Sequence, residues 1–216
     1  MVDRPFSHVR MGAGLPSPQA RSPLPVCPIR AAGARRQRLG LDPPEHTRDD
    51  RSTISTIYGC GSMRPPTWIE RDRLIAGRHP CAWGPGDAPA EVRDLLAEGV
   101  TLFLDLTQDG ELEPYAHFVP PSARHIRMPI RDFSVPTPER LVSTLDTIDA
   151  ELGGGGVVYV HCWAGCGRTG VVVGCWLVRH GTAPGAALER IAKTRGLGCP
   201  QTLEQRLLIL GWEPRR

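Results

Sequence analysis

Several features that would place a chain in a class at once are missing from this sequence. It has no continuous run approaching the roughly 20 apolar residues of a membrane-spanning helix, and no apolar segment of the secretory type at its start. Lysine is almost absent, since Lys193 is the only one and arginine supplies nearly all of the positive charge. The first two absences predict a cytoplasmic protein with no membrane partner.

A cysteine framework is also missing. The chain has seven cysteines, an odd number, with irregular spacing and no CxxC pair: Cys27, Cys60, Cys81, Cys162, Cys166, Cys175 and Cys199. This pattern argues against a disulfide framework and favours a reducing compartment. His161, Cys162 and Cys166 could be imagined as zinc ligands, but no second Cys/His pair has suitable spacing. We therefore expect neither a metal site nor a cofactor.

The first 66 residues have a composition of their own. They contain ten prolines, six glycines and almost no aromatic side chains, and their ten arginines face only five acidic residues. Such a segment cannot bury enough apolar surface to offset its ordering entropy. The sequence predicts a disordered Pro/Arg-rich tail over 1–66, with Met63 as a hypothetical natural start, and one domain over 67–216. A basic excess confined to a tail does not predict nucleic-acid binding.

Residues 67–216 alternate between strand and helix patterns. Strands are expected at 74–76, 100–106, 125–129 and 156–161, and helices at 88–98, 138–152, 169–180, 185–194 and 201–211. The helix at 169–180 is apolar nearly all round, so it is expected to be buried. The alternation predicts an α/β fold with a central, mostly parallel sheet flanked by helices.

Residues 161–170, HCWAGCGRTG, have the composition of an anion-binding loop. A strand leads into His161 and Cys162, and a helix is expected to start near Thr169. Glycines let the backbone N–H groups between strand and helix converge on one point, and the helix N-terminus adds its positive dipole end. Arg168 supplies a planar fork suited to two phosphate oxygens. The loop is therefore predicted to bind a dianion.

Cys162 lies at the start of this loop, where the same positive field would stabilise its thiolate and make it a nucleophile. His161 is placed to hold the loop by hydrogen bonds, and Thr169 to offer its hydroxyl to the sulfur. Cys166 has two interpretations: a small loop residue that packs inward, or a thiol that traps oxidised Cys162 as a disulfide.

The segment His-Cys-x5-Arg-Thr-Gly, with Gly165 in its middle, resembles the signature of the protein-tyrosine and dual-specificity phosphatase superfamily, as in its small bacterial-type members. The resemblance extends over about residues 67–213. It implies a metal-independent phosphatase fold and hydrolysis of phosphomonoesters through a cysteinyl-phosphate. The implied phosphate-binding loop consists of Trp163, Ala164, Gly165, Cys166, Gly167 and Arg168.

The resemblance also implies residues outside the loop. A general-acid aspartate is expected upstream of the cysteine, and Asp132 in MPIRDFSVP is the candidate, with Asp105 a weaker one. Downstream, QTLEQ resembles the loop that orients the hydrolytic water, which makes Gln201 the first candidate for that task and Gln205 the second. A polar helix start would explain those two glutamines nearly as well.

The substrate is less well defined by the sequence. Phosphotyrosine in proteins is favoured, with phosphoserine and phosphothreonine as further substrates. Phosphoinositides are disfavoured because no lysine lies in the loop, and small phosphorylated metabolites or RNA ends remain alternatives. A phosphate-binding module without turnover and a rhodanese-type sulfur transferase are the competing functions; the presence of Arg168, Thr169 and Asp132 favours the phosphatase. The oligomeric state is not indicated.

Overall fold

The computed structural model describes residues 63–213, so the predictions for residues 1–62 lie outside the described residues. The strands are β1 (Thr67–Glu70), β2 (Leu74–Arg78), β3 (Val100–Asp105), β4 (Arg124–Arg127) and β5 (Val157–Cys162). The helices are α2 (Ala88–Ala97), α3 (Pro138–Gly153), α4 (Gly167–Arg179), α5 (Pro184–Arg195) and α6 (Leu203–Leu210), with short 3-10 helices η1 (Pro85–Asp87) and η2 (Ala116–Phe118). Each predicted strand and helix is present, with ends shifted by one or two residues.

The five strands form one sheet in the order β1-β2-β5-β3-β4. Strands β2, β5, β3 and β4 are parallel, and β1 adds an antiparallel edge to β2. The predicted α/β fold with a mostly parallel sheet is thus confirmed. Because the parallel strands end at one edge, Arg78, Cys162, Asp105 and Arg127 come together there. Ligands of such sheets bind at this carboxyl edge.

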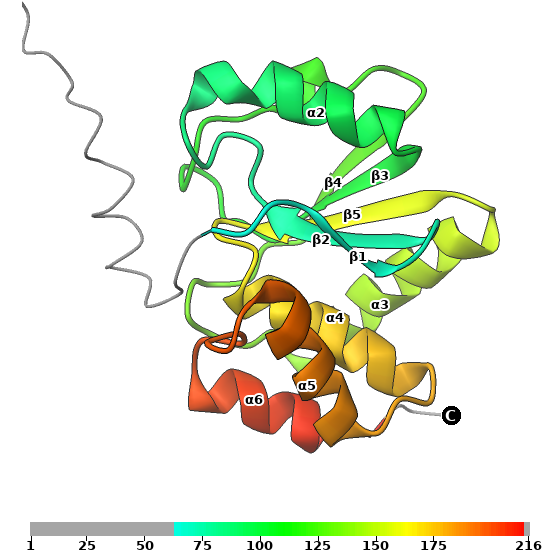
Figure 1. The fold of residues 1–216 in the computed structure, drawn as a ribbon, viewed down its shortest axis with the longest axis vertical. Coiled ribbons are helices and arrows are strands. Elements are labelled where there is room, and N and C mark those ends of the chain that lie inside the picture. Colours follow the sequence, from blue (N-terminus) through cyan, green and yellow to red (C-terminus); the bar gives the residue numbers. More distant parts are fainter. Residues whose placement is uncertain (1–62, 214–216) are drawn as a thin grey trace, which may run out of the picture. The chain divides into compact units, whose positions relative to one another are not determined.

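Helices cover both faces of the sheet (Figure 1): α2 lies on one face, and α3 and α4, with α5 and α6 against α4, lie on the other. Side chains of a strand alternate between the two faces. In β5, Val158 and Val160 therefore belong to the core beneath α3 and α4, and Tyr159 belongs to the core beneath α2. Burial on both faces explains why these strands read as continuous apolar runs.

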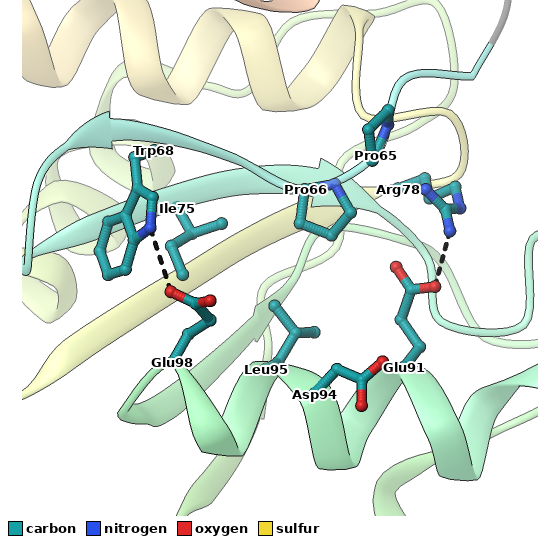
Figure 2. A pocket seen from close by; sticks show the side chains of 9 residues that line it. All are labelled: Pro65, Pro66, Trp68, Ile75, Arg78, Glu91, Asp94, Leu95 and Glu98. Atoms are coloured by element: carbon teal, nitrogen blue, oxygen red, sulfur yellow. Dashed lines mark hydrogen bonds and ion pairs between the residues drawn. The ribbon is translucent and has the colours of Figure 1, made fainter.

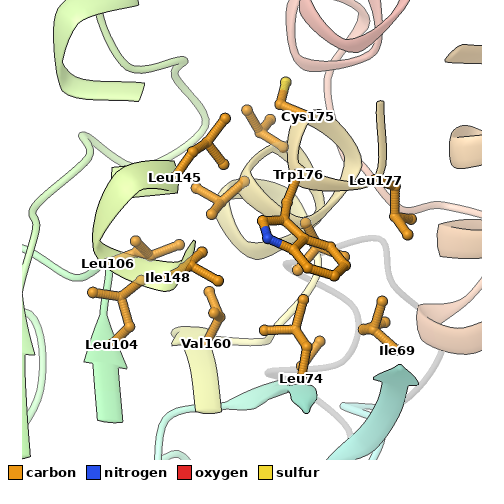
Figure 3. Close-up of a cluster of buried hydrophobic side chains, with 14 of the residues drawn as sticks. Ile69, Leu74, Leu104, Leu106, Leu145, Ile148, Val160, Cys175, Trp176 and Leu177 are labelled. Carbon is orange, nitrogen blue, oxygen red and sulfur yellow. The ribbon is translucent and has the colours of Figure 1, made fainter. Parts of the chain in front are cut away.

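The larger core surrounds α4, whose Trp176 is fully buried beside Leu145 and Ile148 of α3 and Leu74 of β2 (Figure 3). All residues of α4 from Gly167 to Val178 are buried, as its apolar sequence predicted. Residues 162–168, called the catalytic-type loop below, join β5 to α4. This loop is therefore attached at both ends to elements that cannot move independently of the core.

Two features were not apparent from the sequence. Within residues 63–66, which the sequence analysis assigns to the tail, Met63 is buried beside Ala82 and Ala164, whereas Arg64 and Pro65 are exposed. The four-residue strand β1 was not predicted, because so short an edge strand shows no clear alternation. Within the described part of the chain, no helix combines the length and apolarity needed to cross a membrane.

Candidate active site

The loop between β5 and α4 places Cys162 at the carboxyl edge of the sheet. Cys162 is the last residue of β5 and is only 3 % exposed. Gly165 adopts a φ of +70°, a conformation that side chains disfavour, and a Cβ there would also collide with the carbonyl oxygen of Gly77. The loop thus turns sharply enough for α4 to begin at Gly167, so that the unpaired N–H groups of a helix start follow Cys162 within five residues.

Arg168 lies in the first turn of α4 and is 1 % exposed. Its Nη1 donates to the carbonyl oxygen of Ile130 at 3.1 Å and to Oε1 of Glu111 at 2.8 Å. Burial works against the charge of Arg168, but the nearby Cys162 sulfur and Glu111 raise its pKa. Its Nε has no hydrogen-bond partner among the described residues, so this donor remains for a ligand oxygen.

Glu111 is a site residue that sequence analysis missed. It lies in the segment between β3 and η2, where QDGELEP carries three acidic residues and no motif distinguishes one from another. The ion pair with Arg168, between side chains 16 % and 1 % exposed, marks it as an orienting partner of the guanidinium. Only the fold brings residues 57 positions apart into contact, so no local pattern could have identified it.

Asp132 lies in the loop between β4 and α3, next to Arg168. Its Oδ1 is 3.0 Å from Nη2 of Arg168 and accepts a hydrogen bond from the N–H of Phe133. Phe133 has a φ of 57°, so the chain turns sharply directly after the carboxylate. The Asp132 side chain keeps 32 % exposure and therefore faces the open side of the site.

The second acid candidate, Asp105, is in the wrong environment for proton donation. It is fully buried, and its Oδ1 accepts hydrogen bonds from the N–H and hydroxyl of Thr107. Burial alone would raise the pKa of Asp105, but nearby His161, the His125 ring 3.4 Å away and the hydrogen bonds from Thr107 hold it well below its usual range. A carboxyl group held ionised in this way does not protonate a leaving group at neutral pH.

His161 is fully buried behind Cys162. Its Nε2 shares a 2.5 Å hydrogen bond with the hydroxyl of Tyr115, and its Nδ1 lies 3.9 Å from Oδ1 of Asp105. Burial lowers the pKa of His161 to about 4, against the opposing influence of Asp105. A neutral ring fixed on both sides suits the loop-holding task expected from the sequence.

Thr169 of α4 and Gln205 of α6 differ in whether their side chains have hydrogen-bond partners. The Thr169 hydroxyl is buried without a hydrogen-bond partner in residues 63–213, so it remains available to the sulfur or its ligand. Gln205 is fully buried and fully used: its Oε1 accepts from the N–H groups of Gln201 and Thr202, and its Nε2 donates to the carbonyl of Ser134. Gln205 therefore joins the start of α6 to the Asp132 loop.

Gln201 lies closer to the loop itself. It is half-buried, and its Oε1 occupies the space that a Cβ on Gly167 would need. The Gln205 side chain also lies near this position, and the Gln201 oxygen lies nearer to it.

Cys166 and Cys199 form a disulfide, contrary to the prediction that disulfides are unlikely. The pair is 33 residues apart in sequence, and the antiparallel return of α5 along α4 brings the two sulfurs together. Spacing patterns report local cysteine motifs and could not reveal such a contact. In this state the Cys166 sulfur is bonded to Cys199, so it is not a free thiol facing oxidised Cys162.

Arg195 provides a second support for the loop and was also missed. It is 3 % exposed, and its Nε donates to the carbonyl oxygen of Gly165 at 2.8 Å. Its Nη1 donates to the carbonyl of Pro65 at 2.7 Å, and its Nη2 to that of Arg64 at 3.1 Å. One buried guanidinium thus ties the loop to the chain that leads into β1.

Comparison with known proteins relates this chain to phosphatases. A family model described as "Polymorphic toxin system, DSP-PTPase phosphatase" matches residues 83–182, which include Asp132, Cys162 and Arg168. A protein of Invertebrate iridescent virus 3, named "Putative tyrosine phosphatase 067L", is 31% identical over 121 residues, 53% of this chain and 46% of that protein. The phosphatidylglycerophosphate phosphatase PTPMT1 of Arabidopsis thaliana is 31% identical over 50% of this chain and 33% of its own length. The chain thus spans less than half the length of these curated relatives.

Solved structures cover the domain more completely. The active form of Tk-PTP superposes with a TM-score of 0.56 at 27% identity, covering 67% of this chain and 95% of that one. Kinase-associated phosphatase superposes with a TM-score of 0.60 at 17% identity over 68% of this chain and 94% of its own, which shows a shared fold.

Proposed function

Because the chain belongs to the protein-tyrosine and dual-specificity phosphatase superfamily, we propose that it hydrolyses phosphomonoesters through a cysteinyl-phosphate on Cys162. The observation that carries the proposal is the meeting of three groups at the carboxyl edge of the sheet. The Cys162 sulfur raises the pKa of Arg168, which lies on the same loop, and Arg168 Nη2 lies 3.0 Å from Asp132. Nucleophile, phosphate ligand and acid are thereby close enough to act on one substrate.

In the first step, the Cys162 thiolate attacks phosphorus, an S–P bond forms and the bond to the leaving oxygen breaks. Arg168 and the N–H groups of the loop bind the equatorial oxygens, whose charge they stabilise in the transition state. Asp132 transfers its proton to the leaving oxygen. Glu111 holds Arg168 in place through their 2.8 Å ion pair.

In the second step, a water molecule attacks phosphorus and the S–P bond breaks, which returns inorganic phosphate and the Cys162 thiolate. Asp132, now a carboxylate, accepts the proton from the water. Gln201 is proposed to orient that water, and the Thr169 hydroxyl to donate a hydrogen bond to the departing sulfur. Electron pairs and protons balance over the two steps without a metal or a cofactor.

The proposed substrates are phosphorylated proteins, with phosphotyrosine first and phosphoserine and phosphothreonine as further substrates. The viral relative's name as a tyrosine phosphatase supports this choice. A second candidate is a phospholipid, because one relative is named a phosphatidylglycerophosphate phosphatase. Three loop residues between Cys162 and Arg168, namely Trp163, Ala164 and Cys166, carry no positive charge, which favours the protein substrate over a highly charged inositide.

The test is hydrolysis of p-nitrophenyl phosphate by the full chain with and without a chelator, followed by a panel of phosphopeptides and phospholipids. Cys162→Ser is expected to abolish turnover while tungstate, a phosphate analogue, still binds. The matched control is Cys175→Ala. Burial raises the pKa of the Cys175 thiol to about 12, so this cysteine is no nucleophile and the variant should stay active. Near wild-type turnover in Cys162→Ser would refute covalent catalysis at this residue.

A further inference from the structure

A cavity of about 390 Å³ lies between α2 and the β1–β2 edge of the sheet, apart from the catalytic-type loop (Figure 2). Ile75 of β2 and Leu95 of α2 form its apolar floor, and Pro66 and Trp68 of the β1 segment form one wall. The cavity is large enough for a long side chain, and these residues offer an apolar stem a place to pack.

Its opposite wall is acidic. Three acidic residues from α2 and its C-terminal end line the cavity: Glu91, Asp94 and Glu98. The only basic residue in the lining is Arg78. Arg78 Nη2 and Glu91 Oε2 form a 2.6 Å ion pair between side chains 12 % and 14 % exposed. That pair neutralises one carboxylate. Asp94 forms a solvent-exposed ion pair with Arg93 at 3.3 Å, which offsets its charge only in part, and Glu98 keeps its negative charge.

The acidic groups also have unused acceptor capacity. Oε1 of Glu91 is buried without a hydrogen-bond partner among the described residues, and burial raises the pKa of this carboxyl group against the lowering influence of Arg78. Glu98 accepts a hydrogen bond from the Trp68 indole at 3.3 Å, which fixes the aromatic ring beside the carboxylate. A guanidinium or ammonium group would meet carboxylate oxygens and an aromatic ring in one place.

The cavity is connected to the catalytic-type loop. Arg78, which closes one end of it, is the residue of β2 that pairs with Cys162 in the sheet. The Arg78 guanidinium lies 5.9 Å from the ring centre of Trp83, and Trp83 packs in one cluster with Trp163 of the loop. Arg78, Trp83 and Trp163 thus form a series of contacts between the cavity and the loop.

We propose that this cavity is a subsite for an arginine or lysine side chain of a phosphoprotein substrate, in the chain flanking the phosphorylated residue. The inference rests on the proposed phosphatase function and specifies its substrates further: phosphoproteins with a basic residue near the phosphate. The apolar floor takes the aliphatic stem, and Asp94 and Glu98 balance the charge of the cation. The cation shares the Trp68 ring with Arg71, whose guanidinium lies 5.4 Å from the ring centre.

The test compares phosphotyrosine peptides in which one arginine is moved along the flanking chain, each paired with the peptide that has neutral citrulline there. We expect the full chain to prefer arginine at one position by about 10-fold in kcat/KM, the size expected for a partly exposed cation between an aromatic ring and two carboxylates. The variants Asp94→Asn and Glu98→Gln, singly and together, should remove the preference while p-nitrophenyl phosphate hydrolysis changes less than about 2-fold.

The matched control is Glu189→Gln, which removes an exposed acidic residue of α5 that does not line the cavity. Equal kcat/KM for the arginine and citrulline peptides at every position would overturn the subsite. So would a preference that survives in the double variant, or one that Glu189→Gln removes as well. Binding of the same peptide pairs to Cys162→Ser, measured by calorimetry, separates the two proposals: an arginine preference in binding without hydrolysis in the wild type supports the subsite and refutes only the phosphatase function.

Discussion

Breaking the disulfide between Cys166 and Cys199 should cost the domain a large part of its stability. The bond closes a loop of 33 residues. In the chain-entropy model, a cross-link over that length removes denatured-state entropy equivalent to about 3–4 kcal/mol at 25 °C. Both sulfurs are buried, each in a residue 2 % exposed, so no solvent interaction of the freed groups offsets the loss. Since a typical domain is stable by only about 5–15 kcal/mol, the change is large enough to measure easily.

The measurement is urea denaturation, followed by tryptophan fluorescence, of the oxidised chain, the reduced chain and Cys199→Ala. The reduced chain and the variant should unfold at similar, lower urea concentrations, and reductant should leave the variant unchanged. Mass spectrometry of an unreduced digest should recover the peptide pair that contains Cys166 and Cys199. If reductant shifts the wild type no more than it shifts Cys199→Ala, the disulfide does not stabilise the domain and the reasoning is refuted.

Three further predictions follow from the site and the core. Asp132→Ala should slow esters with poor leaving groups by about 10²–10⁴-fold and good ones far less; equal slowing of both classes, measured as kcat on a series of aryl phosphates, would place the acid elsewhere. Gly165→Ala forces a side chain onto a φ of +70° against a backbone carbonyl, so activity should collapse and stability fall by roughly 1–3 kcal/mol, whereas Gly153→Ala, at a position with open space, should change neither. Burial lowers the pKa of His79 to about 3 and that of His161 to about 4. Unfolded histidine takes up protons below about pH 6.5, so the free energy of unfolding should fall as pH drops from 6.5 toward 4, by up to about 1.4 kcal/mol per pH unit for each ring; equal urea midpoints at pH 7 and pH 5 would contradict this.

Local patterns were sufficient for most of the fold. The run from Val157 to Cys162 and the apolar helix that follows it could be read directly, because burial on both sides leaves few positions for polar residues. The strand Thr67–Glu70 could not, since an edge strand of four residues is too short to establish a period. The sequence thus predicts the elements of the sheet better than its edge.

The site residues likewise differ in whether a local sequence pattern reveals them. Cys162 and Arg168 belong to one contiguous motif, and Asp132, which the resemblance implies as the acid, lies 3.0 Å from Arg168. Glu111 and Arg195, by contrast, act on the loop from positions 57 and 30 residues away from their partners. Their types are common and their neighbours unremarkable, so only the folded chain identifies them. The roles of all these residues in catalysis remain predictions for the experiments above.

The supports of the loop determine how much of the chain an active fragment must contain. Three successive loop residues, 165 to 167, are contacted by Arg195, Cys199 and Gln201, all from the end of α5 or the connection to α6. The family model ends at residue 182, before any of these three. A truncation there would retain every residue of the signature motif but remove the segment against which its backbone rests. We therefore expect the minimal active fragment to extend at least through the start of α6.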